Sequence, residues 1–248
     1  MGLDNMIIAQ ELIHTMSLKK GKVGYMALKI DLEKAYDRLE WHFIKDILNL
    51  YKFPTKLVKL IMSCISSSSI SVLLNGGKLY SFLPFRGIRQ GDPLSLYLFI
   101  MCMEMLGVLI RKKCEANLWD PMKTSRNGPS FSHLIFTDDL VLFAKVDRKN
   151  YCNVRETSDS FCELLGQKVS LHKSKVYFSP NIDPNIWEEM CEILGMNSTH
   201  NLGKYLGFPL KLPRLSSQDF NFVIDRVQNK LQGWKSNLLS MAGRLVLS

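Results

Sequence analysis

HLIFTDDLVLFAKV, His133 to Val146, is the stretch of sequence that decides the fold. Residues that favour β-strands flank two adjacent carboxylates, Asp138 and Asp139, so the pattern predicts strands over 131–137 and 140–144 with the acids at the turn between them. A tight hairpin usually has Asn-Gly or Asp-Gly at its turn, because both central residues need a positive φ. Two like charges between buried strands destabilise the fold unless a cation offsets them. On local grounds an ordinary polar turn is the simpler interpretation, and the rest of the chain has to decide.

The chain is basic and rich enough in apolar residues to form a sizeable core. Of its 248 residues, 46% are hydrophobic and 22% are charged, which is typical of a globular protein of one or two domains. Lys and Arg number 32 against 23 Asp and Glu, a formal net charge of +9, which favours nucleic acid as a polyanionic partner. The six cysteines show no C-x-x-C pair and no zinc spacing. With no signal peptide at the N-terminus, we expect an intracellular protein of the nucleus or cytoplasm that is not secreted.

The apolar segment 94–110 resembles a short membrane span. It has 17 residues and contains Glu104, whereas a span needs about 20 apolar residues and few charges. Asp92 as the N-cap and Pro93 at the first helical position are typical of the start of a soluble helix. We therefore predict a buried core helix and no membrane partner, with a membrane-attached module as the weaker alternative.

The order of the predicted elements indicates an α+β fold. Helical periodicity covers 3–18, and alternation over 25–31 predicts a strand that ends at Asp31. Further helices are predicted at 39–50, 57–64, 93–113, 150–165, 183–195, 220–231 and from 238 onward. Hairpins are predicted at 72–83 and 205–212, and a strand at 168–178. This order is that of a split βαβ, ferredoxin-like sheet with helices on one face.

Such a sheet can bring Asp31 and Asp138 together, although they lie 107 residues apart. A carboxylate at one strand end and a carboxylate pair on a hairpin suit two Mg²⁺ ions about 3.5–4 Å apart, which activate a 3′-hydroxyl and stabilise a leaving pyrophosphate. Mg²⁺ prefers carboxylate and phosphate oxygens and needs no His or Cys. The acids therefore favour phosphoryl transfer.

Five blocks of sequence, in order along the chain, resemble those of reverse transcriptases. They are ALKIDLEKAYDR at 27–38, RQGDPLS at 89–95 with YLF at 97–99, FTDD at 136–139, the segment 166–175, and YLG at 205–207. Together with GWK at 233–235 and AGR at 242–244, they are most similar to the non-LTR (LINE-like) retrotransposon enzymes, particularly the plant type. The resemblance covers essentially the whole chain. It implies an RNA-directed DNA polymerase with a reverse transcriptase palm, which uses an RNA template, a DNA or RNA primer and deoxynucleoside triphosphates.

The resemblance also implies roles for single residues. Asp31 and Asp138 would be the principal catalytic and metal-binding acids, supported by Asp139, with two Mg²⁺ ions or Mn²⁺ in their place. Tyr36 would be the steric gate against a 2′-hydroxyl on the incoming nucleotide. The other implied residues are Gln90 and Gly91 in the nucleotide and template pocket, Lys173 (or Lys175) near the pyrophosphate, and Tyr205, Leu206 and Gly207 in the primer grip.

Local readings of these residues stay open beside the implied roles. Tyr36 also fits an aromatic that packs under the first helical turn, Gln90 and Gly91 a plain turn before a helix, and Lys173 a solvated lysine.

The sequence departs from the family pattern at several points. Thr137 replaces the usual Ala before the acids, and Leu96 replaces the usual Pro. The chain starts about 30 residues before Asp31, so from the resemblance we expect it to lack the fingers strands that lie further upstream in the family, and the thumb to be cut off at Ser248. We expect a palm with residual fingers elements over 1–212 and the start of a truncated helical thumb over 213–248. The alternatives are a catalytically inactive remnant that only binds nucleic acid, and another palm-type phosphotransferase such as a nucleotide cyclase.

Overall fold

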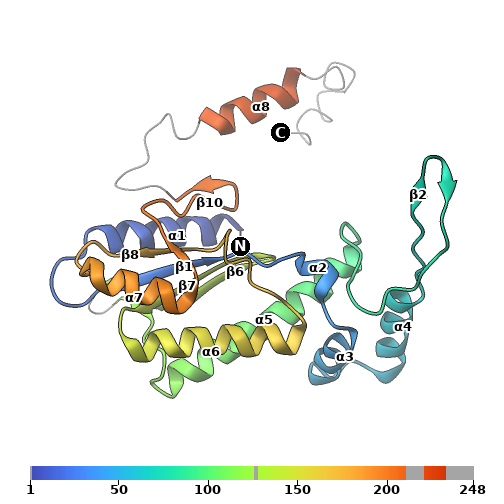
Figure 1. Cartoon of the computed structure of the whole chain (residues 1–248), viewed down its shortest axis with the longest axis horizontal. Helices are drawn as coiled ribbons and strands as arrows, with labels where there is room; N and C mark the ends of the chain where they lie inside the picture. Colours follow the sequence, from blue (N-terminus) through green and yellow to red (C-terminus); the bar gives the residue numbers. More distant parts are fainter. Residues whose placement is uncertain (1, 126–127, 211–220, 233–248) are drawn as a thin grey trace. The chain divides into compact units, whose positions relative to one another are not determined.

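The computed structural model describes residues 2–125, 128–210 and 221–232 (Figure 1). The chain divides into two compact units, residues 1–210 and 211–248. The second unit contributes one described helix, α8 (Asn221–Gln232), where a helix over 220–231 was predicted. The predicted helix from 238 onward and the GWK and AGR motifs lie outside the described residues.

A five-stranded sheet forms the centre of the first unit, in the order β6-β7-β1-β8-β9. The strands are β1 (Tyr25–Ile30), β6 (His133–Phe136), β7 (Asp139–Lys145), β8 (Lys175–Phe178) and β9 (Asn197–Ser198). β7 lies between β1 and β6 and is antiparallel to both, so β1 and β6 run parallel to each other. This arrangement is the predicted split βαβ, and β8 and β9 extend the sheet beyond β1.

Helices cover both faces of this sheet (Figure 1). α5 (Pro93–Glu115) and α6 (Arg148–Leu165) pack on one face, where Leu28 and Leu142 belong to the main hydrophobic core. Strand alternation places Ala27 and Val141 on the other face, and both are fully buried there. α1 (Gly2–Ser17) covers that second face and packs against β6. The structure therefore adds a helix to the face that the sequence analysis left without one.

α5 is a core helix that begins where the sequence predicts. The Asp92 side chain accepts a hydrogen bond of 2.9 Å from the Leu94 backbone N–H, and Pro93 occupies the first turn. Among the helices in the described part of the chain, α5 alone is long and apolar enough to cross a membrane, and 44% of its most apolar window is buried inside the protein. Phe99, Cys102 and Leu106 are buried in the main core, which confirms the predicted burial of this segment.

Besides the central sheet, α1, α5, α6 and α8, the described residues form four helices and three short strand pairs. The helices are α2 (Ala35–Arg38), α3 (Trp41–Leu50), α4 (Thr55–Ser66) and α7 (Pro184–Leu194). The short strand pairs are β2 (Leu73–Leu74) with β3 (Gly77–Lys78), β4 (Met122–Lys123) with β5 (Ser130–Phe131), and β10 (Lys204–Tyr205) with β11 (Phe208–Pro209). The turn between β2 and β3 is Asn75-Gly76, with φ of 49° and 82°, as the Asn-Gly signal predicts.

Two local predictions were wrong. The predicted strand 168–178 is a strand only from Lys175 onward, because 170–174 folds into a turn in which the Ser174 N–H donates to the Ser170 carbonyl at 2.8 Å. The acids were expected to form the turn between β6 and β7. Phe136 pairs instead with Asp139, so Thr137 and Asp138 form the turn and Asp139 is the first residue of β7.

Candidate active site

The sheet register brings two of the predicted acids to neighbouring positions. Ile30 of β1 pairs with Leu140 of β7, and continuing the antiparallel register by one residue sets Asp31 opposite Asp139. Residues directly opposite in such a pair have Cβ atoms roughly 4.5–5.5 Å apart. Asp138 is the next residue toward the turn, so all three acids lie at one end of the sheet.

Asp139 is half-buried among charged neighbours. Burial raises the pKa of its carboxyl group, and the negative charges of Asp138 and Asp31 raise it further. The Lys29 ammonium group and the Leu206 backbone amide act in the opposite direction and lower this pKa. A carboxylate with two like-charged neighbours and partial desolvation is a place where a cation binds favourably.

Thr137 holds the turn in an unusual conformation. Its φ is 52°, a left-handed value that is a genuine outlier for a β-branched residue. Its side-chain Oγ1 donates a hydrogen bond of 2.9 Å to Asp138 Oδ1. One of the two carboxylate oxygens of Asp138 is therefore already engaged by the neighbouring hydroxyl.

Asp31 is fixed to the turn that follows α6. Its backbone N–H donates to Ser174 Oγ at 3.1 Å, and its carbonyl accepts from the Ser170 N–H at 2.8 Å. The Lys173 Nζ lies 4.0 Å from Asp31 Oδ1. Lys175 lies on β8 directly opposite Lys29 of β1. Of the two lysines considered for the pyrophosphate role, Lys173 is thus the one that contacts an acid.

The three acids offer the ligand chemistry of a hard divalent cation. They supply only carboxylate oxygens, two of them from neighbouring strands and the third from the adjoining turn. In the part of the chain that the structure describes, no three His, Cys, Asp or Glu side chains are grouped so that they could hold a metal ion as they stand. Asp138 is exposed and the Asp31 side chain is 42% exposed, so both have room to turn toward Asp139. The residues therefore fit such an ion in kind, and the sheet places them at one end, although their side chains are not grouped around one point as they stand.

Tyr36 joins the core to the acids. Its ring stacks on Phe99 of α5, with ring centroids 4.5 Å apart and planes at 13°. Burial, and then the negative charge of Asp138, raise the pKa of its hydroxyl group. The residue therefore packs as the local reading of the sequence expects, and its polar end also lies within the electrostatic reach of Asp138.

The predicted nucleotide and template loop lines a cavity of about 660 Å³. Gln90 is part of its wall, together with Asp37, Arg86 and Arg89. Gly91 is not among the described lining residues; it has a φ of 88° and open space around it. The loop is tied to the segment that carries Tyr36. The backbone bonds run from Gly87 N to Leu39 O at 2.8 Å and from Ile88 N to Tyr36 O at 2.9 Å. The sequence analysis missed both arginines, although they lie beside or within the block that contains Gln90.

Two of the predicted primer-grip residues, Tyr205 and Leu206, interact electrostatically with Asp139. Tyr205 is buried in β10, and burial followed by the charge of Asp139 raises its pKa to about 12. Leu206 and Gly207 form the turn to β11, with φ of 51° and 83°. The Leu206 amide acts on the Asp139 carboxylate, and the Lys29 Nζ donates to the Lys204 carbonyl. Lys29 is a third residue that sequence reasoning missed, although alternation along β1 puts it on the same face as Asp31.

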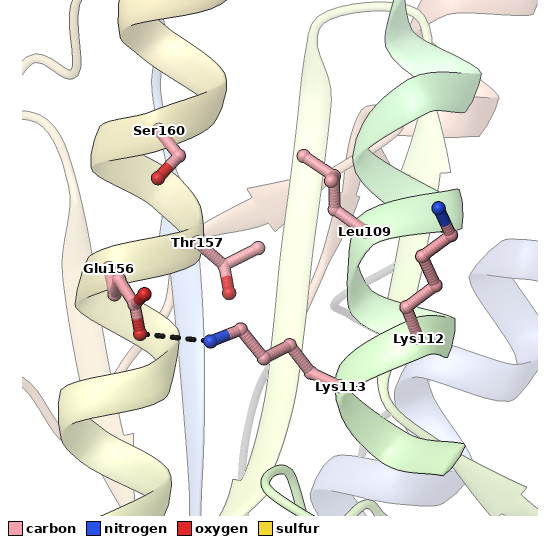
Figure 2. A pocket seen from close by; sticks show the side chains of 6 residues that line it. All are labelled: Leu109, Lys112, Lys113, Glu156, Thr157 and Ser160. Atoms are coloured by element: carbon pink, nitrogen blue, oxygen red, sulfur yellow. Dashed lines mark hydrogen bonds and ion pairs between the residues drawn. The ribbon is translucent and has the colours of Figure 1, made fainter. Parts of the chain in front are cut away.

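A second cavity, of about 230 Å³, lies between α5 and α6 (Figure 2). Lys113 reaches across it from α5 and donates to Glu156 of α6 at 2.9 Å and to Asn153 at 3.1 Å. The other residues that line it are Leu109, Lys112, Thr157 and Ser160. It lies on the side of the sheet that α5 and α6 cover, away from the face that carries Asp139, and Lys113 is already paired with Glu156.

Comparisons with known proteins agree on one family. The model of the family "Reverse transcriptase (RNA-dependent DNA polymerase)" matches residues 2–210. An uncharacterized mitochondrial protein of Arabidopsis thaliana is 45% identical over 67 residues, which are 27% of this chain and 55% of that protein. A 149 kDa protein of transposon TX1 from Xenopus laevis is 24% identical over 249 residues, covering 98% of this chain and 18% of the relative. The Pol polyprotein of the R2DM retrotransposable element of Drosophila melanogaster is 29% identical over 170 residues, covering 68% and 15%.

Solved structures share the fold. Apo telomerase of Candida tropicalis, truncated from its C-terminal domain, matches with a TM-score of 0.52 and 19% identity over 73% of this chain and 35% of that one. Telomerase of Candida albicans matches with a TM-score of 0.50 and 18% identity over 73% and 30%. The chain thus spans about half of the Arabidopsis relative and less than a fifth of the two transposon proteins.

Proposed function

The chain belongs to the reverse transcriptase family as a domain of the non-LTR retrotransposon type, and on that premise we propose that it catalyses RNA-directed DNA synthesis at Asp31, Asp138 and Asp139. The observation that carries the proposal is the register of β1 and β7, which pairs Ile30 with Leu140 and, continued by one residue, sets Asp31 opposite Asp139 with Asp138 beside it. Members of this family depend on a divalent metal ion, and we propose two Mg²⁺ ions here. The carboxylates would hold them, and added positive charge would be favourable at the half-buried Asp139, which has Asp138 and Asp31 as like-charged neighbours.

The proposed reaction is an in-line displacement. The primer 3′-oxygen forms a bond to the α-phosphorus of a deoxynucleoside triphosphate, the bond from that phosphorus to the bridging oxygen breaks, and pyrophosphate leaves while the hydroxyl proton passes to solvent. The metal ions, when bound, would stabilise the negative charge on the attacking and leaving oxygens. The protein residues position the reactants, which is the larger part of catalysis in phosphoryl transfer.

The neighbouring residues supply that positioning. Tyr36 is held rigidly by its stacking on Phe99, which suits a gate that excludes a 2′-hydroxyl. Gln90 lines the cavity with Arg86 and Arg89, and we assign this cavity to the template and the nucleotide. Lys173, exposed and 4.0 Å from Asp31, has the reach to meet the leaving pyrophosphate.

Nucleic acid is the proposed partner. The formal net charge of +9 favours binding to phosphate backbones, and the solved Candida albicans telomerase is in complex with a fragment of telomeric RNA. We propose an RNA template and a DNA or RNA primer.

Within the chain, 1–212 would act as the palm with residual fingers elements and 213–248 as the start of the thumb. An intracellular location is supported by six cysteines that are all free.

An inactive remnant that only binds nucleic acid is the second candidate. It is favoured by the strained Thr137, whose hydroxyl already engages Asp138 Oδ1. This candidate predicts normal binding of primer–template and no synthesis under any metal.

Primer extension on an RNA template separates the two candidates. The wild-type chain, Asp31→Asn and Asp139→Asn are compared with Asp159→Asn, which removes an exposed carboxylate on α6. We expect wild type and Asp159→Asn to incorporate complementary deoxynucleotides only with Mg²⁺ or Mn²⁺, and the other two variants to lose at least about a hundredfold in rate. Equal extension by Asp139→Asn, or extension in EDTA, would overturn the proposal. Tight binding without extension by wild type would establish the remnant.

A further inference from the structure

The hairpin of β10 and β11 is joined to the acid-bearing strands by a hydrogen bond, and one of its amides affects the pKa of Asp139. Lys29 of β1 donates through its Nζ to the Lys204 carbonyl, and the Leu206 amide acts on the Asp139 carboxylate of β7. These contacts lie on either side of Tyr205. The hairpin is thereby connected to both central strands at the end where the acids lie.

Lys29 is held in place, unlike most lysines. Lysine is a strongly hydrated cation that is mostly exposed on protein surfaces, yet Lys29 is only partly exposed. It pairs with Lys175 across β1 and β8, and like charges directly opposite destabilise a sheet. The hairpin carbonyl and the nearby negative charge of Asp139 offset that repulsion.

The hairpin has further attachments, among them a hydrogen bond to α1. The Tyr205 side chain is fully buried, and Gln10 of α1 donates through Nε2 to the Pro209 carbonyl at 3.3 Å. These contacts hold the hairpin on α1. The Gln10 bond attaches β11 to α1, whereas the Lys29 bond attaches β10 to the strand that leads to Asp31.

We propose that Lys29 is a positioning residue, which sets the 204–209 hairpin in register with Asp139 so that a primer 3′ end on the hairpin meets the carboxylate site. The inference rests on the proposed function, because the primer-grip role of the hairpin belongs to it. A displacement of about 1 Å between reacting groups can lower a rate by about a hundredfold. A single ammonium contact beside the acids is therefore enough to matter for rate without a large effect on folding.

The first experiment measures hydrogen exchange in the full 248-residue chain and needs no activity. Lys29→Met removes the donor and Lys29→Arg keeps it. Lys145→Met removes one positive charge from the opposite end of β7, where Lys145 pairs with Tyr25. We expect exchange at the amides of 204–208 to be about tenfold faster in Lys29→Met, a loss of about 1.4 kcal/mol of local protection by the conversion at 25 °C, and unchanged in the other two. Unchanged protection in Lys29→Met, or equal loss in Lys145→Met, overturns the inference. If Lys29→Met does not fold, Lys29→Ala, which also lacks a donor, replaces it under the same criterion.

The second experiment divides binding from rate in primer extension. We expect Lys29→Met to lower kcat at least tenfold, with less than a twofold change in the KM for the nucleotide, and Lys29→Arg to restore most of kcat. A kcat that is unchanged in a chain whose hairpin exchanges faster would overturn the positioning role. Absence of extension in wild type counts against the proposed function alone, since the exchange measurement still decides whether Lys29 holds the hairpin.

Discussion

Replacing Thr137 by glycine and by alanine should change stability in the reverse of the usual order, in which the alanine variant is the more stable. Thr137 has a φ of 52°, a conformation that glycine adopts freely and β-branched residues avoid. Its side chain makes one exposed hydrogen bond, 2.9 Å long, to Asp138. We therefore expect Thr137→Gly to be more stable than Thr137→Ala.

The magnitude follows from three contributions. Because glycine adopts the left-handed conformation without steric strain, Thr137→Gly relieves about 1–2 kcal/mol of strain. The greater conformational freedom of glycine in the unfolded chain reduces this gain by about 0.5–1 kcal/mol. Both variants lose the exposed hydrogen bond, worth about 0.5 kcal/mol. Thr137→Gly should therefore lie within about 1 kcal/mol of wild type, and above Thr137→Ala by about 0.5–1 kcal/mol.

Urea denaturation of the two variants measures this difference directly. Thr199, whose φ is not in the left-handed region, is the control, and there the Gly variant should be less stable than the Ala variant by about 0.5–1 kcal/mol. If Thr137→Ala proves the more stable of its pair, the strain argument is refuted. Both Thr137 variants also free Asp138 Oδ1, so Mn²⁺ affinity should rise, by about twofold if the released bond is worth about 0.5 kcal/mol.

Three further predictions concern the acids, the loop and the charge. Burial raises the folded-state pKa of Asp139, so the native state binds this proton more tightly than the unfolded chain, and stability falls as the pH rises from the unfolded-state pKa through the folded-state pKa. Asp139→Asn should remove that fall in denaturation measured at several pH values. An unchanged pH profile of stability would contradict this prediction. Gly87→Ala should destabilise the fold more than Gly91→Ala in the same assay. Both have a left-handed φ, but an added Cβ at Gly87 would lie 2.6 Å from the Asp37 carbonyl oxygen whereas Gly91 has open space; equal losses would contradict it. Anisotropy should show that Asp138→Asn still binds primer–template and that the affinity falls steeply with salt, since dispersed Lys and Arg bind the phosphates; salt-independent binding would exclude this partner.

The architecture was largely predictable because hydrophobic periodicity and caps act locally. α5 begins at its Asp92 N-cap, and α6 is followed by Gly166 in the left-handed conformation, with a φ of 71°. The Asn75-Gly76 turn also formed as predicted, because its conformational requirement resides in the two residues themselves.

The details of the site were less predictable because they depend on contacts between distant segments. The alternation of apolar and polar residues could not show that the chain turns at 170–174. That turn is held by a hydrogen bond between distant segments, in which the Ser174 hydroxyl accepts from the N–H of Asp31, 143 residues away. The shift of the turn to Thr137-Asp138 depends on the pairing of Phe136 with Asp139. A propensity argument disfavours that turn because Thr avoids a positive φ.

Lys29 shows a third limit of prediction from the sequence. The sequence puts it on the face of Asp31, but its partner is a backbone carbonyl 175 residues away, and a carbonyl acceptor leaves no trace in the sequence.

The central claim is that Asp31, Asp138 and Asp139 form one divalent-metal site. Electron paramagnetic resonance of Mn²⁺, titrated into the chain with primer–template and a non-hydrolysable deoxynucleotide analogue present, tests it most directly. We predict two bound Mn²⁺ ions per wild-type chain, at most one in Asp31→Asn or Asp139→Asn, and two in the control Asp159→Asn. Two ions retained with the same affinity in Asp139→Asn, or none in the wild-type chain bound to its nucleic acid, would contradict the claim.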